Sequence, residues 1–250
     1  MASEPIIPLD PSWPAMSLDQ VRALLTAPGA KFETDEVAIR GTPTRVWKNA
    51  PPSLPWLFTA ARAHGDRVMT IYEDERVSYD AAFRAAAALS HHLAGLGVGK
   101  GDRVALAMRN LPEWPVIFFA ITALGAIAVP LNAWWTGQEL AYGLKDSGAK
   151  LLIADAERLD RIAPHLGELD ALEAMLISRS LGELAHGAKA LEDVIGAPPA
   201  YAELAPAELP PVEIAPDDAA TIFYTSGTTG NPKGALGSHR NMTTKILTTA

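Results

Sequence analysis

The sequence predicts an α/β fold in which a mainly parallel sheet is layered between helices. From about Leu54 onward, short apolar runs typical of strands alternate with helical stretches, which is the pattern of a parallel sheet covered by crossover helices. Hydrophobic residues make up 48% and charged residues 20% of the 250 residues, so the chain can bury a core. Near the C-terminus an apolar run, residues 219–224, leads directly into a glycine-rich loop.

The chain is expected to fall into four parts. Residues 1–53 read as a proline-rich arm, and residues 54–196 as a first α/β subdomain. Residues 197–216 are rich in alanine and proline, which predicts an extended surface connection. Residues 217–250 are expected to begin a second α/β subdomain, with a strand, the glycine-rich loop and a helix starting near Asn241.

The helices of the first subdomain are predicted from residues that cap helices. Ser78, Asn110 and Thr136 each precede a helical stretch, and their side chains can accept free backbone N–H groups of a first turn. Thr136 and Glu139 have the spacing of a capping box. The expected elements are a hairpin (68–73 with 76–77), a helix (78 to about 96), a strand (103–108), a helix (110 to about 125), a strand (127–130), a helix (136–147) stopped by Gly148, a strand (150–154), a helix (157–166) and a strand (174–177).

A glycine-rich run over residues 95–101 has two interpretations: a phosphate-binding loop or a tight connection. Phosphate loops follow a strand and precede a helix, so that backbone N–H groups point at the anion. Here the order is reversed, because the run ends a helix and leads into a strand. We therefore interpret it as a connection in which glycines adopt positive φ.

The composition excludes several classes of function. A formal net charge of −8 gives no basic field to attract nucleic acid, and the absence of cysteine excludes disulfides and thiolate metal sites. His91 and His92 do not predict a metal site, because adjacent residues on a helix point about 100° apart. No secretory signal or membrane-spanning run is recognised, so a cytoplasmic location is expected.

The loop over residues 225–234 carries the chemistry. It contains four hydroxyl side chains, three glycines and one lysine within ten residues. Glycines allow successive N–H groups to converge on one oxyanion, while hydroxyl groups and a lysine add donors, a combination that suits a polyphosphate. A Walker A loop is excluded, because Pro232 precedes Lys233 and Gly234 follows it. A flexible linker is the alternative, but it needs neither a buried strand in front nor a Pro-Lys-Gly sequence behind.

This loop, YTSGTTGNPKG at residues 224–234, resembles the phosphate-binding signature of the adenylate-forming superfamily, which contains acyl-CoA synthetases, luciferases and peptide-synthetase adenylation domains. Residues 98–114 (VGKGDRVALAMRNLPEW), residues 124–132 (LGAIAVPLN) and Glu139-Leu140 resemble the N-terminal part of the same superfamily in order and spacing. Together the similar segments extend from about Leu54 to the end of the chain.

The resemblance implies an acid–thiol ligase. A carboxylic acid, fatty or aryl, would attack ATP to form an acyl-adenylate and pyrophosphate, and coenzyme A would then take the acyl group; Mg²⁺ is expected with the triphosphate. The loop would hold the outer phosphates of ATP. Carried over by position, the ATP-binding residues are Thr225, Ser226, Gly227, Thr228, Thr229, Gly230 and Lys233, with Lys233 also stabilising charge during catalysis.

Two further features have alternative interpretations. His239 matches a position that is often His or Arg in the superfamily, and it suits either the active site or the packing of a helix start. Trp134 and Trp135 suit either stacking on an aromatic ligand or a packed turn before Thr136.

Members of the superfamily are longer than this chain, so we expect a truncated piece that does not complete adenylation alone. Exposed apolar surface is then expected to favour a homo-oligomer. Two other functions stay open: an adenylation domain that loads a carrier protein, and a noncatalytic nucleotide-binding module completed by another chain.

Overall fold

The computed structural model describes residues 17–225 and 230–249, and these fall into two compact units, with the division after Ala50. The first unit contains α1 (Leu18–Leu25) and an antiparallel hairpin of β1 (Thr34–Ile39) and β2 (Thr42–Trp47). The expectation of nothing but a proline-rich arm is therefore wrong for residues 18–47. Two local signals explain these elements: Ser17 and Gln20 form a capping box, and Arg40 and Gly41 turn the hairpin with positive φ.

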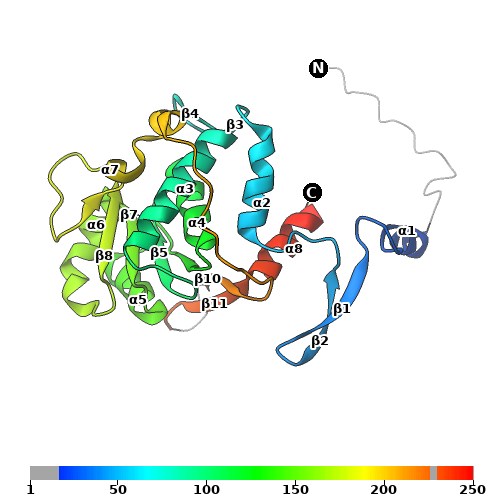
Figure 1. The fold of residues 1–250 in the computed structure, drawn as a ribbon. Coiled ribbons are helices and arrows are strands. Elements are labelled where there is room, and N and C mark those ends of the chain that lie inside the picture. Colours follow the sequence, from blue (N-terminus) through cyan, green and yellow to red (C-terminus); the bar gives the residue numbers. More distant parts are fainter. Residues whose placement is uncertain (1–16, 226–229, 250) are drawn as a thin grey trace, which may run out of the picture. The chain divides into compact units, whose positions relative to one another are not determined.

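The second unit is built on one mainly parallel sheet, as the sequence predicts, and this sheet has seven strands. Figure 1 shows helices packed around it. Its order is β11-β10-β6-β5-β7-β8-β9, and every neighbouring pair is parallel except β10 with β11. The strands are β5 (Arg103–Ala107), β6 (Ile127–Pro130), β7 (Leu151–Asp155), β8 (Ala174–Ser178), β9 (Lys189–Ala190), β10 (Ala219–Thr225) and β11 (Lys233–Ser238). The strands expected in a second subdomain, β10 and β11, thus extend the same sheet.

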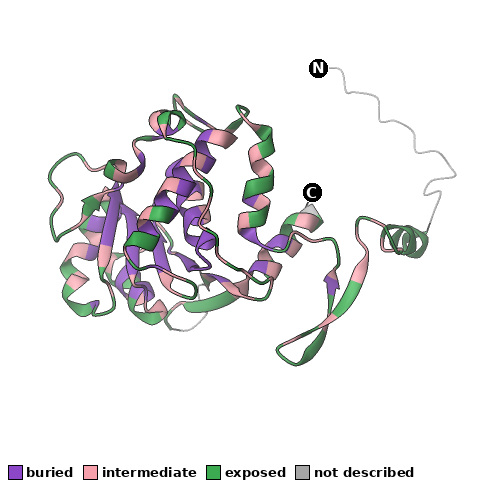
Figure 2. Ribbon diagram, in the orientation of Figure 1, coloured by how far each residue is buried: buried purple, intermediate pink, exposed green. Residues whose placement is uncertain are grey.

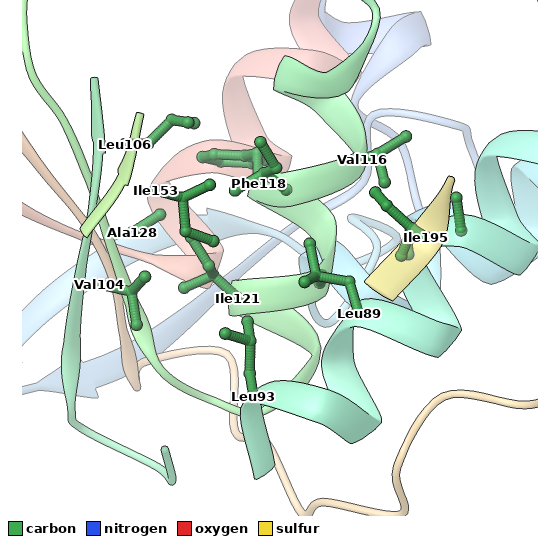
Figure 3. Packing of buried hydrophobic residues seen from close by; sticks show 14 of the residues in the cluster. Leu89, Leu93, Val104, Leu106, Val116, Phe118, Ile121, Ala128, Ile153 and Ile195 are labelled. Atoms are coloured by element: carbon green, nitrogen blue, oxygen red, sulfur yellow. The ribbon is translucent and has the colours of Figure 1, made fainter. Parts of the chain in front are cut away.

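Helices cover both faces of this sheet, because its strands are apolar on both sides. In β5, Val104 and Leu106 belong to one buried cluster, and Ala105 and Ala107 belong to the other. Figure 2 shows that the strands in the centre of this sheet are buried. The first cluster lies under α2 (Leu54–Ala61), α3 (Tyr79–Gly95), α4 (Glu113–Ala123) and α7 (Glu192–Ile195), and the second under α5 (Gly137–Ser147) and α6 (Ala156–Ile162). Figure 3 shows the first cluster, where Leu89, Ile121 and Ile195 pack over the sheet.

Most local predictions are confirmed. The expected hairpin is β3 (Val68–Tyr72) with β4 (Glu75–Ser78), and Ser78 caps α3 by accepting the N–H of Ala81. Thr136 and Glu139 form the capping box of α5, which Gly148 ends with a φ of 61°. In the run over residues 95–101, Gly97 and Gly101 have positive φ and connect α3 to β5.

Three expected boundaries are wrong. Asn110 does not cap α4: the N-cap is Pro112, whose φ and ψ of −57° and −26° are already helical. The connection over 197–216 begins with a 3₁₀ helix, Pro198–Glu203, because the fully buried Tyr201 anchors it to the core. The last helix, α8 (His239–Thr249), starts before Asn241, because Ser238 and Asn241 bond reciprocally around its first turn.

Among the described residues, no helix combines the length and apolar character needed to cross a membrane.

Candidate functional site

The carboxyl ends of five neighbouring strands lie along one edge of the sheet, since β10, β6, β5, β7 and β8 run parallel. The chain leaves β5 through α4, on one face, to reach β6, whereas it leaves β7 through α6, on the other face, to reach β8. The crossovers that follow the neighbouring strands β5 and β7 therefore diverge. In open α/β sheets, ligands bind in the crevice outside the strands at such a switch point.

A cavity of about 770 Å³ occupies this position. It is lined by residues 108–111 after β5, residues 131–134 after β6, residues 155–158 after β7 and Arg179 after β8. We call this cavity the switch-point crevice. Its volume lies within the range of about 300–1,000 Å³ that is common for small-molecule sites.

Asp155 holds three of these loops together. Its carboxylate accepts the backbone N–H of Arg109, at 3.1 Å, and the N–H of Arg158 at the start of α6. It also pairs with the Arg158 guanidinium, whose Nε donates to the carbonyl of Ala133. The loops after β5, β6 and β7 are thus joined through one buried ion pair. Sequence reasoning missed Asp155, although an Asp between an apolar strand and a helix is a common N-cap.

Arg109 and Trp134 form the open side of the crevice. Both side chains are exposed, and the Arg109 guanidinium lies 4.0 Å from the centre of the Trp134 indole ring. Within the described part of the chain, no carboxylate pairs with the Arg109 guanidinium. The pair therefore presents a cation and a flat aromatic ring to a ligand, while the neighbouring Trp135 packs inward against Tyr224. The packed-turn interpretation is thus confirmed for Trp135. Stacking on an aromatic ligand stays a prediction, and Trp134 is the residue whose ring is exposed for it.

Arg179 closes the crevice at the end of β8 with a backbone φ of 57°. Its guanidinium donates to Glu113 at the start of α4 and to Glu75 of β4. Burial opposes the charge of Arg179, but the hydrogen bonds to Glu113 and Glu75 outweigh it and raise the pKa of Arg179. Arg179 thus holds the hairpin, through Glu75, and α4, through Glu113, at the end of β8. Only 2% of the Glu113 side chain is exposed.

The glycine-rich loop also begins at the carboxyl ends of the parallel strands. Thr225 ends β10 and Lys233 begins β11, and they are direct partners in the antiparallel pair. We call the adjoining ends of β10 and β11 the loop stem. Opposite residues in such a pair place their side chains on the same face, with Cβ atoms roughly 5 Å apart. Both are exposed, and no described carboxylate lies within ion-pair distance of Lys233. Gly230 has a φ of 97°. Ser226, Gly227, Thr228 and Thr229 lie outside the described residues.

His239 lies beside the amino ends of the parallel strands, away from the carboxyl ends where Thr225 and Lys233 lie. It follows the last residue of β11, roughly 20 Å from Lys233 by the rise of a strand. The side chain is fully buried, and its Nδ1 accepts the backbone N–H of Leu54 at 3.2 Å. Burial lowers the pKa of His239 to about 4. The structure thus places His239 in the packing of the start of α8.

Within residues 17–225 and 230–249, no group of three or more His, Asp and Glu side chains is arranged to hold a metal ion. The described side chains therefore do not form a magnesium site by themselves. A nucleoside triphosphate brings phosphate oxygens of its own to such an ion.

The profile of one protein family, described as AMP-binding enzyme, matches residues 57–250. Long-chain-fatty-acid–CoA ligase FadD13 from Mycobacterium tuberculosis is 33% identical over 195 residues, which cover 76% of this chain and 36% of that protein. The 3-hydroxybenzoate–CoA/4-hydroxybenzoate–CoA ligase of Thauera aromatica is 31% identical, over 73% of this chain and 33% of that protein. The chain thus spans about a third of the length of these relatives.

Solved structures give the same result. The anthranilate CoA ligase AuaEII, solved with anthranoyl-AMP, is 27% identical and superposes with a TM-score of 0.65, covering 75% of this chain and 35% of that one. The N-terminal domain of FACL13 from Mycobacterium tuberculosis is 30% identical with a TM-score of 0.61, over 75% of this chain and 44% of that one.

Proposed function

The chain belongs to the AMP-binding enzyme family, and from this premise we propose that it forms the nucleotide-binding part of an ATP-dependent acid–thiol ligase. In the proposed reaction, a carboxylate oxygen attacks the α-phosphorus of ATP and pyrophosphate leaves. The thiol sulfur of coenzyme A then attacks the acyl carbon and AMP leaves. The observation that carries the proposal is the pairing of Thr225 with Lys233 at the carboxyl edge of a parallel sheet.

Thr225 and Lys233 are proposed to bind the outer phosphates of ATP. Their side chains share one face of the β10–β11 pair, so a hydroxyl and an ammonium group can reach the same phosphate group. Ser226, Gly227, Thr228, Thr229 and Gly230 complete the proposed set by sequence position. The positive charge of Lys233 would stabilise the charge that develops on departing pyrophosphate. Magnesium, when bound to the triphosphate, would supply further neutralisation.

The switch-point crevice is proposed to take the nucleotide end of coenzyme A. That end carries an adenine ring and several phosphates, and the crevice offers Trp134 for stacking and the Arg109 guanidinium for a phosphate. The crevice and the loop stem lie along the same edge of the sheet. This feature favours free coenzyme A over a carrier protein, whose phosphopantetheine arm lacks the adenine nucleotide.

The acid is proposed to be a fatty or aryl carboxylic acid, since the relatives are named for both kinds of substrate. We also propose a cytoplasmic location and self-association of the chain. Support for self-association comes from the edge strand β11 and its neighbour β10, where two large apolar side chains are exposed. Phe223 of β10 is 39% exposed and Leu236 of β11 is 50% exposed.

Binding of ATP and of pyrophosphate to the purified chain tests the proposal by calorimetry. Lys233→Ala should weaken both by about 10- to 100-fold, the range expected for loss of a charge-assisted hydrogen bond. Lys189→Ala is the matched control, because Lys189 is an exposed lysine on β9 at the opposite end of the sheet. Equal affinity of Lys233→Ala and the unchanged chain for pyrophosphate would overturn the phosphate role of the loop stem.

A further inference from the structure

Tyr224 connects the loop stem to a helix on the second face of the sheet. It precedes Thr225 at the end of β10, and its hydroxyl donates to Asp146 Oδ2 of α5 at 2.7 Å. The carbonyl of Gly143, one turn earlier in α5, lies 3.2 Å from the same hydroxyl. Burial, followed by the hydrogen bond to Asp146, raises the pKa of Tyr224, so the hydroxyl keeps its proton and acts as a donor.

Two neighbours hold the Tyr224 ring. Trp135 meets it edge to face, with ring centres 5.7 Å apart. Gly234, its partner across the β10–β11 pair and the residue next to Lys233, also lies close to the ring. A Cβ at Gly234 would lie 3.4 Å from the Tyr224 ring and 2.9 Å from Ile222, so a larger residue would push against this packing. Tyr224 therefore contacts both strands of the loop stem.

The sheet ladder leaves the end of β10 in need of such an anchor. β10 pairs with β6 at Thr221 and Ala128. Thr221 lies four residues before Thr225 along the strand. β11, the other neighbour of β10, is the edge strand of the sheet. The side chain of Tyr224, held by Asp146, thus connects the last residues of β10 to the body of the fold.

We propose that Tyr224 is a positioning residue for the polyphosphate of ATP, acting through its hydrogen bond to Asp146. The inference rests on the proposed function, because it assumes that Thr225 and Lys233 bind the outer phosphates. Tyr224 and Gly234 face α5, while Thr225 and Lys233, the next pair along the strands, face the opposite side. Holding the Tyr224 ring therefore sets where the Thr225 hydroxyl and the Lys233 ammonium group stand.

The test compares Tyr224→Phe, Asp146→Ala and the double variant of the 250-residue chain. Tyr224→Phe keeps the packed ring and removes only the hydroxyl. Each single variant should bind ATP and pyrophosphate about 3- to 10-fold more weakly, as expected for one lost hydrogen bond, with AMP affinity unchanged. The double variant should be no weaker than either single variant, because both remove the same interaction. Tyr142→Phe is the control, since its hydroxyl lies 3.4 Å from the same carboxylate.

Two results would overturn the inference: unchanged pyrophosphate affinity of Tyr224→Phe, or an equal loss of AMP affinity, which would indicate a general structural defect. Loss of pyrophosphate binding in Lys233→Ala with normal binding in Tyr224→Phe refutes the inference and leaves the proposed function intact. Normal binding in Lys233→Ala refutes the proposed function instead. Hydrogen exchange then decides the positioning role without a ligand: the amides of Thr225 and Lys233 should exchange about 3- to 10-fold faster in Tyr224→Phe, and unchanged rates would contradict it.

Discussion

The guanidinium Nη1 of Arg158 lies 3.0 Å from Asp155 Oδ2, and the two side chains are only 1% and 8% exposed. A buried ion pair is costly to form but much more costly to break from one side, because the remaining charge then lies in a medium of low polarity. In this fold the pair also joins the loops that follow β5, β6 and β7. The stability of the fold and the shape of the switch-point crevice therefore both depend on the carboxylate of Asp155.

Asp155→Ala should lower the free energy of unfolding by about 3 kcal/mol or more, since it removes the N-cap of α6 and leaves Arg158 buried with the exposed Glu157 as its remaining carboxylate. Urea denaturation measures the change. Asp160→Ala is the control, because Asp160 is an exposed carboxylate on the same helix, and it should change stability by less than about 0.5 kcal/mol. Similar stability of the two variants would contradict the role of Asp155.

Trp134→Ala should weaken the binding of coenzyme A by about 5-fold or more without changing stability. The side chain is 69% exposed, so little packing is lost, while stacking of a base on an aromatic ring contributes about 1–3 kcal/mol. Calorimetric titration measures the affinity. Trp56→Ala on α2, where the indole is 53% exposed outside the crevice, should bind coenzyme A normally. Equal affinities of the two variants would place the nucleotide elsewhere.

Gly137→Ala should destabilise the chain by about 2 kcal/mol or more. A Cβ at Gly137, in the first turn of α5, would lie 2.1 Å from the backbone carbonyl oxygen of Arg161, which cannot rotate away as a side chain can. Gly95→Ala at the end of α3 is the matched control. A Cβ there meets no atom within 4 Å, and alanine favours a helix over glycine by up to about 1 kcal/mol. Thermal unfolding should therefore separate the two variants in opposite directions.

His239 should make stability depend on pH in mildly acidic solution. Burial lowers its pKa in the folded chain to about 4, against an ordinary value of 6.5, so the unfolded chain binds the proton more readily. The contribution is complete above about pH 6.5 and is lost as the pH falls toward about 4. Between about pH 7 and pH 5, the unchanged chain should lose about 2 kcal/mol more than His239→Gln. An identical loss in both proteins would show that His239 is not buried in its neutral form.

Features set by neighbouring residues could be predicted from the sequence, and features set by distant contacts could not. The start and end of α5 follow from Thr136, Glu139 and Gly148, because the hydrogen bonds of both ends are local. Asn110 has the same capping chemistry, yet α4 starts later. Its first residue, Glu113, is held by Arg179 from the far end of β8, and no local pattern carries that contact.

The same distinction applies to the candidate site. The hydroxyl, glycine and lysine residues of the loop are neighbours in the sequence, so Thr225 and Lys233 could be named in advance. The structure adds that these two residues are direct partners across β10 and β11. The switch-point crevice is assembled from the ends of four strands, and its key carboxylate, Asp155, is recognisable only once β5, β6 and β7 are side by side. Tyr224 looks like an ordinary strand residue until Asp146 of α5 is placed beside it.

The pairing of Thr221 with Ala128 has a consequence for how the chain acquires its structure. These residues lie about ninety positions apart, and the intervening chain builds β7, β8 and β9 on the other side of β5 before it returns. Contacts between such distant residues form slowly, because a long loop must first close. β5 to β9 should therefore assemble early in folding and acquire protection from exchange first, and the strand that carries Thr225 should dock last.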